Sequence, residues 1–133
     1  MEALAVPIRT EADIVSARQT GRRMAAELGF SNSQLTMIAT AISELARNVM
    51  TYAGSGEVLL ELCDNGARRG ILVIARDEGP GIADIDLAMQ DGFSTGRSLG
   101  LGLPGARRLM DEFEIVSELG HGTTVTARKW ASR

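Results

Sequence analysis

The chain has 133 residues, 44% of them hydrophobic, which is enough to bury one sizeable core in a single domain spanning residues 1–133. The formal net charge of −3, without long blocks of one sign, disfavours a nucleic acid or an anionic membrane as a partner. Cys63 is the only cysteine, which excludes an internal disulfide and a cysteine-built metal cluster and fits a reducing cytoplasm.

The N-terminus has no basic stretch followed by a long apolar run, and no apolar segment is long enough to span a bilayer. We therefore expect a soluble cytoplasmic protein. Lys129 is the only lysine, so no lysine is placed to bind nucleotide phosphates as in a P-loop or a eukaryotic-type protein kinase.

An edge strand and two capped helices are predicted in the first part of the chain. Residues 3–8 alternate weakly and include a proline, which is typical of an edge strand. Capping boxes at residues 10–13 and 31–34 each precede apolar residues at helical spacing. Gly29 closes the first predicted helix, and the second ends near Gly54.

The rest of the chain predicts two hairpins with a glycine-rich segment and a helix between them. The pattern favours an α+β fold, a two-layer α/β sandwich with a mixed, mostly antiparallel sheet of about five strands and about three main helices on one face. The predicted elements are strands Glu57 to Cys63 and Gly70 to Arg76, a helix from Leu103 to Glu112, and strands Glu114 to Leu119 and Thr123 to Lys129.

Glu44 and Asn48 lie one turn apart on the second predicted helix, so their side chains project from the same face. A carboxylate can act as a base on a water or hydroxyl, and an amide oxygen can bind Mg²⁺. Both positions also lie opposite the apolar stripe, which is the pattern of solvated surface residues. The spacing alone leaves the two interpretations open.

Asp77 comes where the apolar strand ILVIA runs into Glu78-Gly79-Pro80-Gly81. A carboxylate at the end of a buried strand can accept a hydrogen bond from the amino group of a flat heterocycle, and Gly79 and Gly81 allow close approach to the backbone. The alternative is an aspartate that ends a strand in a tight turn.

Two further glycine clusters follow. Gly100, Gly102 and Gly105 lead into the last predicted helix, where free amides form an anion site suited to phosphate oxygens, unless the segment is only a flexible loop. Residues 91–98 are small and polar enough to move as a lid over such a site. Thr123 starts the last strand after the turn Gly120-His121-Gly122, which also reads as an ordinary hairpin turn.

The motifs appear in one order: ExxxN on a helix, DxGxG after a strand, a lid, GxG before a helix, and GxGT before the last strand. This order resembles the GHKL ATPase superfamily, which includes histidine kinases, gyrase-type ATPases, Hsp90 chaperones and bacterial anti-sigma serine kinases. The resemblance implies that ATP and Mg²⁺ are bound. It assigns the adenine amino group to Asp77, Mg²⁺ to Asn48, the general base to Glu44 and support of the adenine to Thr123. Glycines 79 and 81 would frame the adenine, and glycines 100, 102 and 105 the triphosphate.

The size of the chain favours the stand-alone anti-sigma-type serine/threonine kinases within this superfamily. The stretches DEGPGIADI and DGFSTGRSLGLGLPGARRLMDEF look similar to the switch-protein kinases of bacterial stressosomes. Such kinases phosphorylate small STAS-domain antagonist or scaffold proteins and, once released, activate a PP2C-type phosphatase. Two alternatives are an anti-sigma factor that binds a sigma factor directly, and a nucleotide-dependent binding module without kinase activity.

Overall fold

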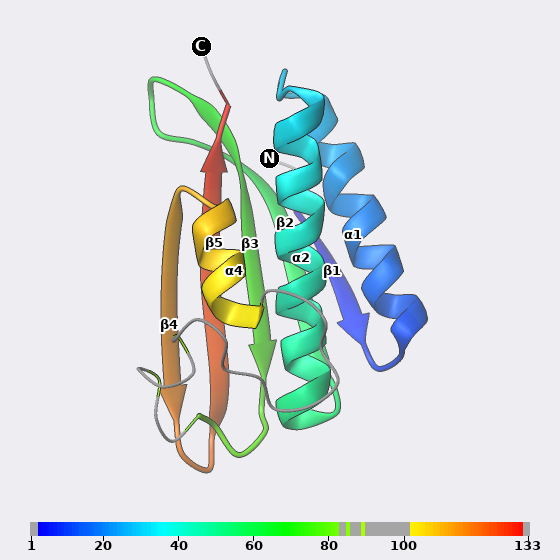
Figure 1. Ribbon diagram of the computed structural model, residues 1–133, viewed down its shortest axis with the longest axis vertical. Coiled ribbons are helices and arrows are strands. Elements are labelled where there is room, and N and C mark those ends of the chain that lie inside the picture. Colours follow the sequence, from blue (N-terminus) through cyan, green and yellow to red (C-terminus); the bar gives the residue numbers. More distant parts are fainter. Residues whose placement is uncertain (1–2, 83–84, 86–88, 90–101, 132–133) are drawn as a thin grey trace.

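The computed structural model describes residues 3–82, 85, 89 and 102–131, and the described part forms two layers (Figure 1). One layer is a five-stranded sheet in which every pairing is antiparallel, and three helices cover one of its faces. This architecture confirms the predicted α+β sandwich. The elements are β1 (Ala3–Ile8), α1 (Glu11–Ala26), α2 (Asn32–Ala53), β2 (Gly56–Asp64), β3 (Arg69–Asp77), α4 (Gly102–Leu109), β4 (Glu112–Glu118) and β5 (Gly122–Trp130).

Both long helices begin at the predicted capping boxes. The Thr10 and Ser31 side chains accept hydrogen bonds from the backbone amides of Asp13 and Gln34. The side chains of Asp13 and Gln34 in turn accept from the backbone amides of Thr10 and Ser31. These reciprocal bonds satisfy amides that have no partner inside a helix and so fix where each helix starts. In the described ranges, no helix is both long and apolar enough to cross a membrane.

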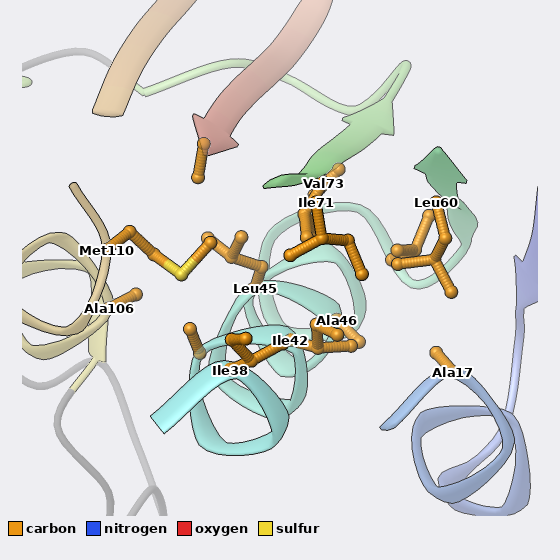
Figure 2. Packing of buried hydrophobic residues seen from close by; sticks show 14 of the residues in the cluster. Ala17, Ile38, Ile42, Leu45, Ala46, Leu60, Ile71, Val73, Ala106 and Met110 are labelled. Carbon is orange, nitrogen blue, oxygen red and sulfur yellow. The ribbon is translucent and has the colours of Figure 1, made fainter. Parts of the chain in front are cut away.

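The core lies between the helices and the sheet, with α2 at its centre (Figure 2). Ala17 of α1 and Ala106 of α4 face α2 from opposite sides, while strand residues close the third side. Each large apolar side chain removed from water in this way contributes about 1.5–3 kcal/mol. The fully buried large residues include Ile38, Ile42, Leu45 and Val49 of α2, Val58 and Leu60 of β2, Ile71 and Val73 of β3, and Val125 of β5.

The strand order is β1-β2-β3-β5-β4, so the last strand along the chain lies inside the sheet. β1 is at one edge, as its proline predicts, and β4 is at the other. In this register Asp77, the final residue of β3, lies opposite Thr123, and Thr123 lies opposite Ser117 of β4. The sheet therefore brings the ends of three strands together.

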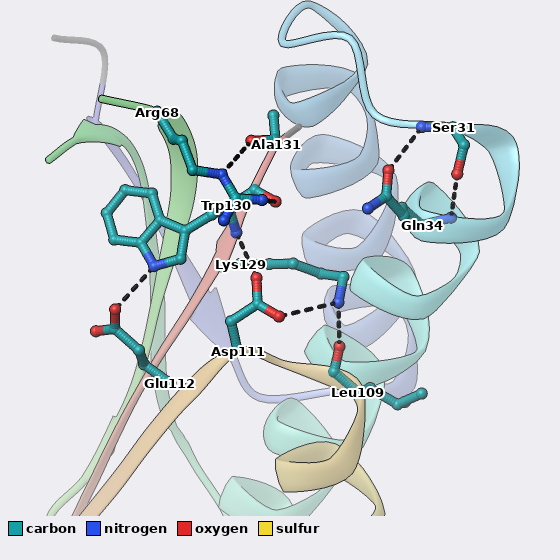
Figure 3. A network of polar contacts seen from close by, with 9 residues as sticks. All are labelled: Ser31, Gln34, Arg68, Leu109, Asp111, Glu112, Lys129, Trp130 and Ala131. Atoms are coloured by element: carbon teal, nitrogen blue, oxygen red, sulfur yellow. Dashed lines mark hydrogen bonds and ion pairs between the residues drawn. The ribbon is translucent and has the colours of Figure 1, made fainter. Parts of the chain in front are cut away.

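A polar network fixes the C-terminal end of α4 (Figure 3). The nearly buried Lys129 donates to the Leu109 carbonyl at 2.9 Å and lies 3.7 Å from the Asp111 carboxylate. A cation at this end of a helix satisfies a terminal carbonyl and complements the helix dipole. The sequence predicted that this helix ends at Glu112, which is three residues too late. In the structure α4 ends at Leu109, and Glu112 is the first residue of β4.

Candidate functional site

Glu44 and Asn48 are both half-buried on α2, and Glu44 has a specific partner. Its Oε1 accepts a hydrogen bond from the backbone amide of Gly102 at 2.9 Å. Gly102 is the first residue of α4, so the carboxylate lies at the positive end of that helix. Glu44 is thus held at the junction of two helices, which a simple solvated surface position would not require.

Asp77 is 6% exposed at the end of β3. Its Oδ1 accepts hydrogen bonds from the amides of Gly79 at 3.0 Å and Thr123 at 3.3 Å. Both bonds use the same oxygen, so within the described part of the chain Oδ2 keeps its acceptor capacity. The backbone bonds fix the carboxylate in place, and Oδ2 can accept from a ligand.

The glycines after Asp77 are required by the protein's own packing. A side chain at Gly79 would meet Cβ of Ala53 at 2.6 Å, at the end of α2. Gly81 has a positive φ of 82°, and a side chain there would meet the carbonyl oxygen of Glu118 at 2.6 Å. The backbone of this turn therefore packs directly against the end of α2 on one side and the β4–β5 hairpin on the other. Only glycine allows the backbone to approach its neighbours so closely.

The predicted phosphate-binding segment is described only in part. Gly100 and the candidate lid at 91–98 lie outside the described residues. Gly102 starts α4 with a positive φ of 64°, and Gly105 is buried inside the same helix. The described part of this segment therefore contains the helix start that the sequence predicted, together with its contact to Glu44.

Thr123 is buried, and its hydroxyl has a partner that the sequence analysis missed. The Ser117 hydroxyl lies 2.8 Å from that of Thr123 and also accepts from the Ile82 amide at 2.7 Å. Ser117 falls in an alternating strand at a position that shares its face with Phe113 and Ile115, where an apolar residue is expected. A polar residue at such a position was the signal that could have identified it.

The second half of α2 joins these groups. Glu44 contacts the start of α4, Asn48 follows one turn later, and Ala53 packs against the turn after Asp77. Ala53 follows Glu44 by nine positions, which corresponds to about 14 Å along the helix axis. The arrangement offers acceptors for a heterocycle at one end and a carboxylate beside a helix N-terminus at the other.

The same arrangement fits a magnesium ion held chiefly by a ligand's phosphates and by water. Among the described residues, no group of three histidine, cysteine, aspartate or glutamate side chains is placed to hold a metal. Mg²⁺ accepts such sparse protein coordination and prefers oxygen ligands, which Asn48 provides.

The lone His121 is exposed in the β4–β5 turn, beside Glu118.

Residues 7–129 match the family model described as the histidine kinase-like ATPase domain. The chain belongs to this family. The serine/threonine-protein kinase RsbT of Bacillus subtilis is 54% identical over 125 residues, which are 94% of this chain and 94% of RsbT. This identity over nearly the whole of both proteins places the chain among the serine/threonine kinases of the family. An anti-sigma F factor of Bacillus cytotoxicus is 33% identical over 87% of this chain and 83% of its own length.

Two solved structures share the fold of the family. The RsbU and RsbW domains of Rv1364c from Mycobacterium tuberculosis superpose with a TM-score of 0.64 and 23% identity over all of this chain, which spans 33% of that longer one. The mycobacterial sensor histidine kinase MprB superposes with a TM-score of 0.58 and 16% identity, over 96% of this chain and 98% of its own.

Proposed function

We propose that this protein is an ATP- and Mg²⁺-dependent serine/threonine kinase of a bacterial partner-switching stress response. Its substrates are STAS-domain antagonist or scaffold proteins, and in its released form it binds and activates a PP2C-type phosphatase in the cytoplasm. The 54% identity to RsbT supports this proposal. The observation that carries it is the contact between Glu44 and the start of α4, because it brings a base and an anion-binding helix end to one place.

The two ends of the site take different parts of the nucleotide. Asp77 accepts from the adenine amino group through Oδ2, while its Oδ1 stays bonded to the backbone. Thr123 supports the adenine on the side of β5, and Gly79 and Gly81 frame it. The amides of the segment containing Gly100, Gly102 and Gly105 bind the phosphate oxygens.

Asn48 lies between these two ends and is the protein ligand that we assign to magnesium. When bound, Mg²⁺ supplies charge neutralisation for the phosphate oxygens. Asn48 is half-buried and one turn from Glu44, so its amide oxygen would lie on the same side of α2 as the base.

Glu44 acts as the general base in this proposal. Its carboxylate orients the acceptor serine or threonine hydroxyl and takes its proton as the oxygen attacks the γ-phosphorus, while the β–γ bridging bond breaks and ADP leaves. The amide of Gly102 now donates to Glu44. A phosphate oxygen bound at that amide would take the place of the Glu44 carboxylate and leave the carboxylate available to the acceptor hydroxyl.

The test measures transfer of label from γ-labelled ATP to a STAS-domain protein. Glu44→Gln keeps an oxygen that can accept from Gly102 but removes the base, so we expect transfer to fall by about 10²- to 10⁴-fold with nucleotide binding retained. Glu57→Gln makes the same chemical change at a surface ion pair with Arg76 and serves as the control. Transfer by Glu44→Gln at the wild-type rate would refute the assignment of the base.

The anti-sigma F relatives favour a second candidate, an anti-sigma factor that binds a sigma factor directly and phosphorylates its antagonist. Stable capture of a purified sigma factor by this chain would support that candidate. A third outcome of the same assay, nucleotide binding by the wild type without any transfer, would identify a binding module instead.

A further inference from the structure

The turn between β2 and β3 contains the pair Asn65-Gly66, and both residues are exposed. In such a pair the backbone nitrogen of the second residue can approach the side-chain amide carbon of the first, because glycine puts no side chain in the way. Gly66 has a positive φ of 93°, and a Cβ placed there would meet nothing within 4 Å. The pair is therefore open to solvent and uncrowded.

The Asn65 side chain is held and polarised by the same turn. Its Oδ1 accepts hydrogen bonds from the backbone amides of Ala67 at 3.0 Å and Arg68 at 2.8 Å. These bonds fold the side chain toward the residues that follow it, which is also the direction of the Gly66 nitrogen. Two amides that donate to one carbonyl oxygen stabilise the negative charge that develops there when a nucleophile attacks the carbon.

The Gly66 nitrogen has an acceptor for its own hydrogen. Its N–H donates to Oδ1 of Asp64, and a carboxylate in this position can take the proton as the nitrogen attacks. The direction of each of these bonds is fixed, since every donor is a backbone N–H. Residues 64–68 thus bring together a base, a nucleophile and a carbonyl carbon with its oxyanion donors.

We propose that Asn65 is a site of spontaneous deamidation. The Gly66 nitrogen attacks Cγ of Asn65, and its proton passes through Asp64 to the side-chain nitrogen. The bond between Cγ and that nitrogen then breaks, and ammonia leaves. Water opens the resulting cyclic succinimide by adding to one of its carbonyl carbons, which gives either aspartate or isoaspartate. Both products carry a new carboxylate.

The reaction changes the hairpin but not the proposed nucleotide site. In isoaspartate the backbone runs through the former side chain, so the acceptor for the Ala67 and Arg68 amides moves out of place. The Arg68 side chain also donates to the Ala131 carbonyl at 2.8 Å, so a displaced turn weakens the attachment of the chain after β5 (Figure 3). Asp77 lies at the opposite end of β3 from this turn (Figure 1).

The experiment incubates the purified protein at neutral pH and follows each asparagine by peptide mapping with mass spectrometry. Exchange of the amide for a carboxylate adds about 1 Da, and an isoaspartyl methyltransferase labels the isoaspartate product. Conversion at Asn65 should be at least about tenfold faster than at Asn32, because only Asn65 has a base beside its nucleophile. Asn32 is also exposed, but it begins α2 and is followed by Ser33.

Single substitutions test the parts of the reaction. Asp64→Ser keeps an oxygen that can accept from the Gly66 amide but removes the base, so conversion should slow by about tenfold or more. Glu57→Gln removes a carboxylate at the other end of β2 and should leave the rate unchanged. Asn65→Gln would have to close a larger ring, so the mass gain and the label should disappear from this position.

Conversion at Asn65 that is no faster than at Asn32 would overturn this inference, because the turn would then protect its asparagine. An unchanged rate in Asp64→Ser would overturn the assisted reaction. The result does not depend on nucleotide binding. A folded protein that deamidates at Asn65 but binds no ATP would support this inference while overturning the proposed function.

Discussion

The substitution Asp77→Asn separates the structural from the ligand-binding role of this residue. Asparagine keeps one oxygen, which can accept from the amides of Gly79 and Thr123 as Oδ1 does. These bonds become weaker when the acceptor is neutral, but the cost of burying a charge at a site 6% exposed also disappears. We therefore expect the free energy of unfolding without nucleotide to change by less than about 1 kcal/mol.

The affinity for ATP should fall far more than the stability, because the amide NH₂ group replaces the oxygen that we propose accepts from the adenine amino group. Loss of a charged hydrogen bond, with two donors left facing each other, costs about 2–3 kcal/mol, or about 30- to 150-fold in Kd. Isothermal titration calorimetry with Mg-ATP measures this, and urea unfolding measures stability.

Two variants complete the test. Asp64→Asn makes the same change in a turn where Asp64 accepts from the Gly66 amide, and it should affect neither quantity strongly. Asp77→Ala leaves two backbone amides without their acceptor and should lower stability by about 2–4 kcal/mol. ATP binding by Asp77→Asn with the wild-type affinity would refute the role of Asp77 in binding the base.

Three further substitutions test the described contacts. Gly122→Ala should lower the urea midpoint far more than Gly66→Ala. Both glycines have a positive φ, but only at Gly122 would the new Cβ clash with a backbone oxygen, that of Asp77. Equal losses of stability in the two variants would contradict this prediction. Lys129→Met should lower the free energy of unfolding by about 1–2 kcal/mol, because the carbonyl that ends α4 loses a charged donor, and an unchanged urea curve would contradict this. The backbone amide of Arg9 donates to the Asp13 carboxylate and holds the pKa of that group below its ordinary value. The carboxylate therefore stabilises the fold at neutral pH, and this contribution is lost as the pH falls through the pKa of Asp13 in the folded protein. Asp13→Asn should therefore flatten the dependence of stability on pH in acid, and curves of equal slope would show that the carboxylate contributes nothing.

Local sequence determined much of the fold. The capping boxes at Thr10 and Ser31 fixed the helix starts because their hydrogen bonds span only three residues. Asp77 was expected at the end of a buried strand, and β3 ends there. Such features depend on neighbours along the chain, so a single sequence is enough to find them.

Contacts between distant residues could not be predicted in the same way. The bond between Glu44 and Gly102 joins residues 58 positions apart, and nothing in the local pattern of α2 distinguishes it from a solvated face. The contact of Ser117 with Thr123 depends on the strand register that places the two residues opposite each other. The end of α4 at Leu109 likewise depends on Lys129, which reaches it from the C-terminal end of β5. These positions are set by sheet pairing and packing rather than by propensity.

The central place of β5 has a consequence for synthesis. Asp77 and its partner Thr123 are 46 residues apart, and β3 remains an open edge until β5 leaves the ribosome and inserts between β3 and β4. Pairing over such a separation forms late and slowly, because a long loop must close first. The nascent chain therefore carries Glu44, Asn48 and Asp77 well before it can hold them in place, and the proposed nucleotide site is among the last parts of the protein to form.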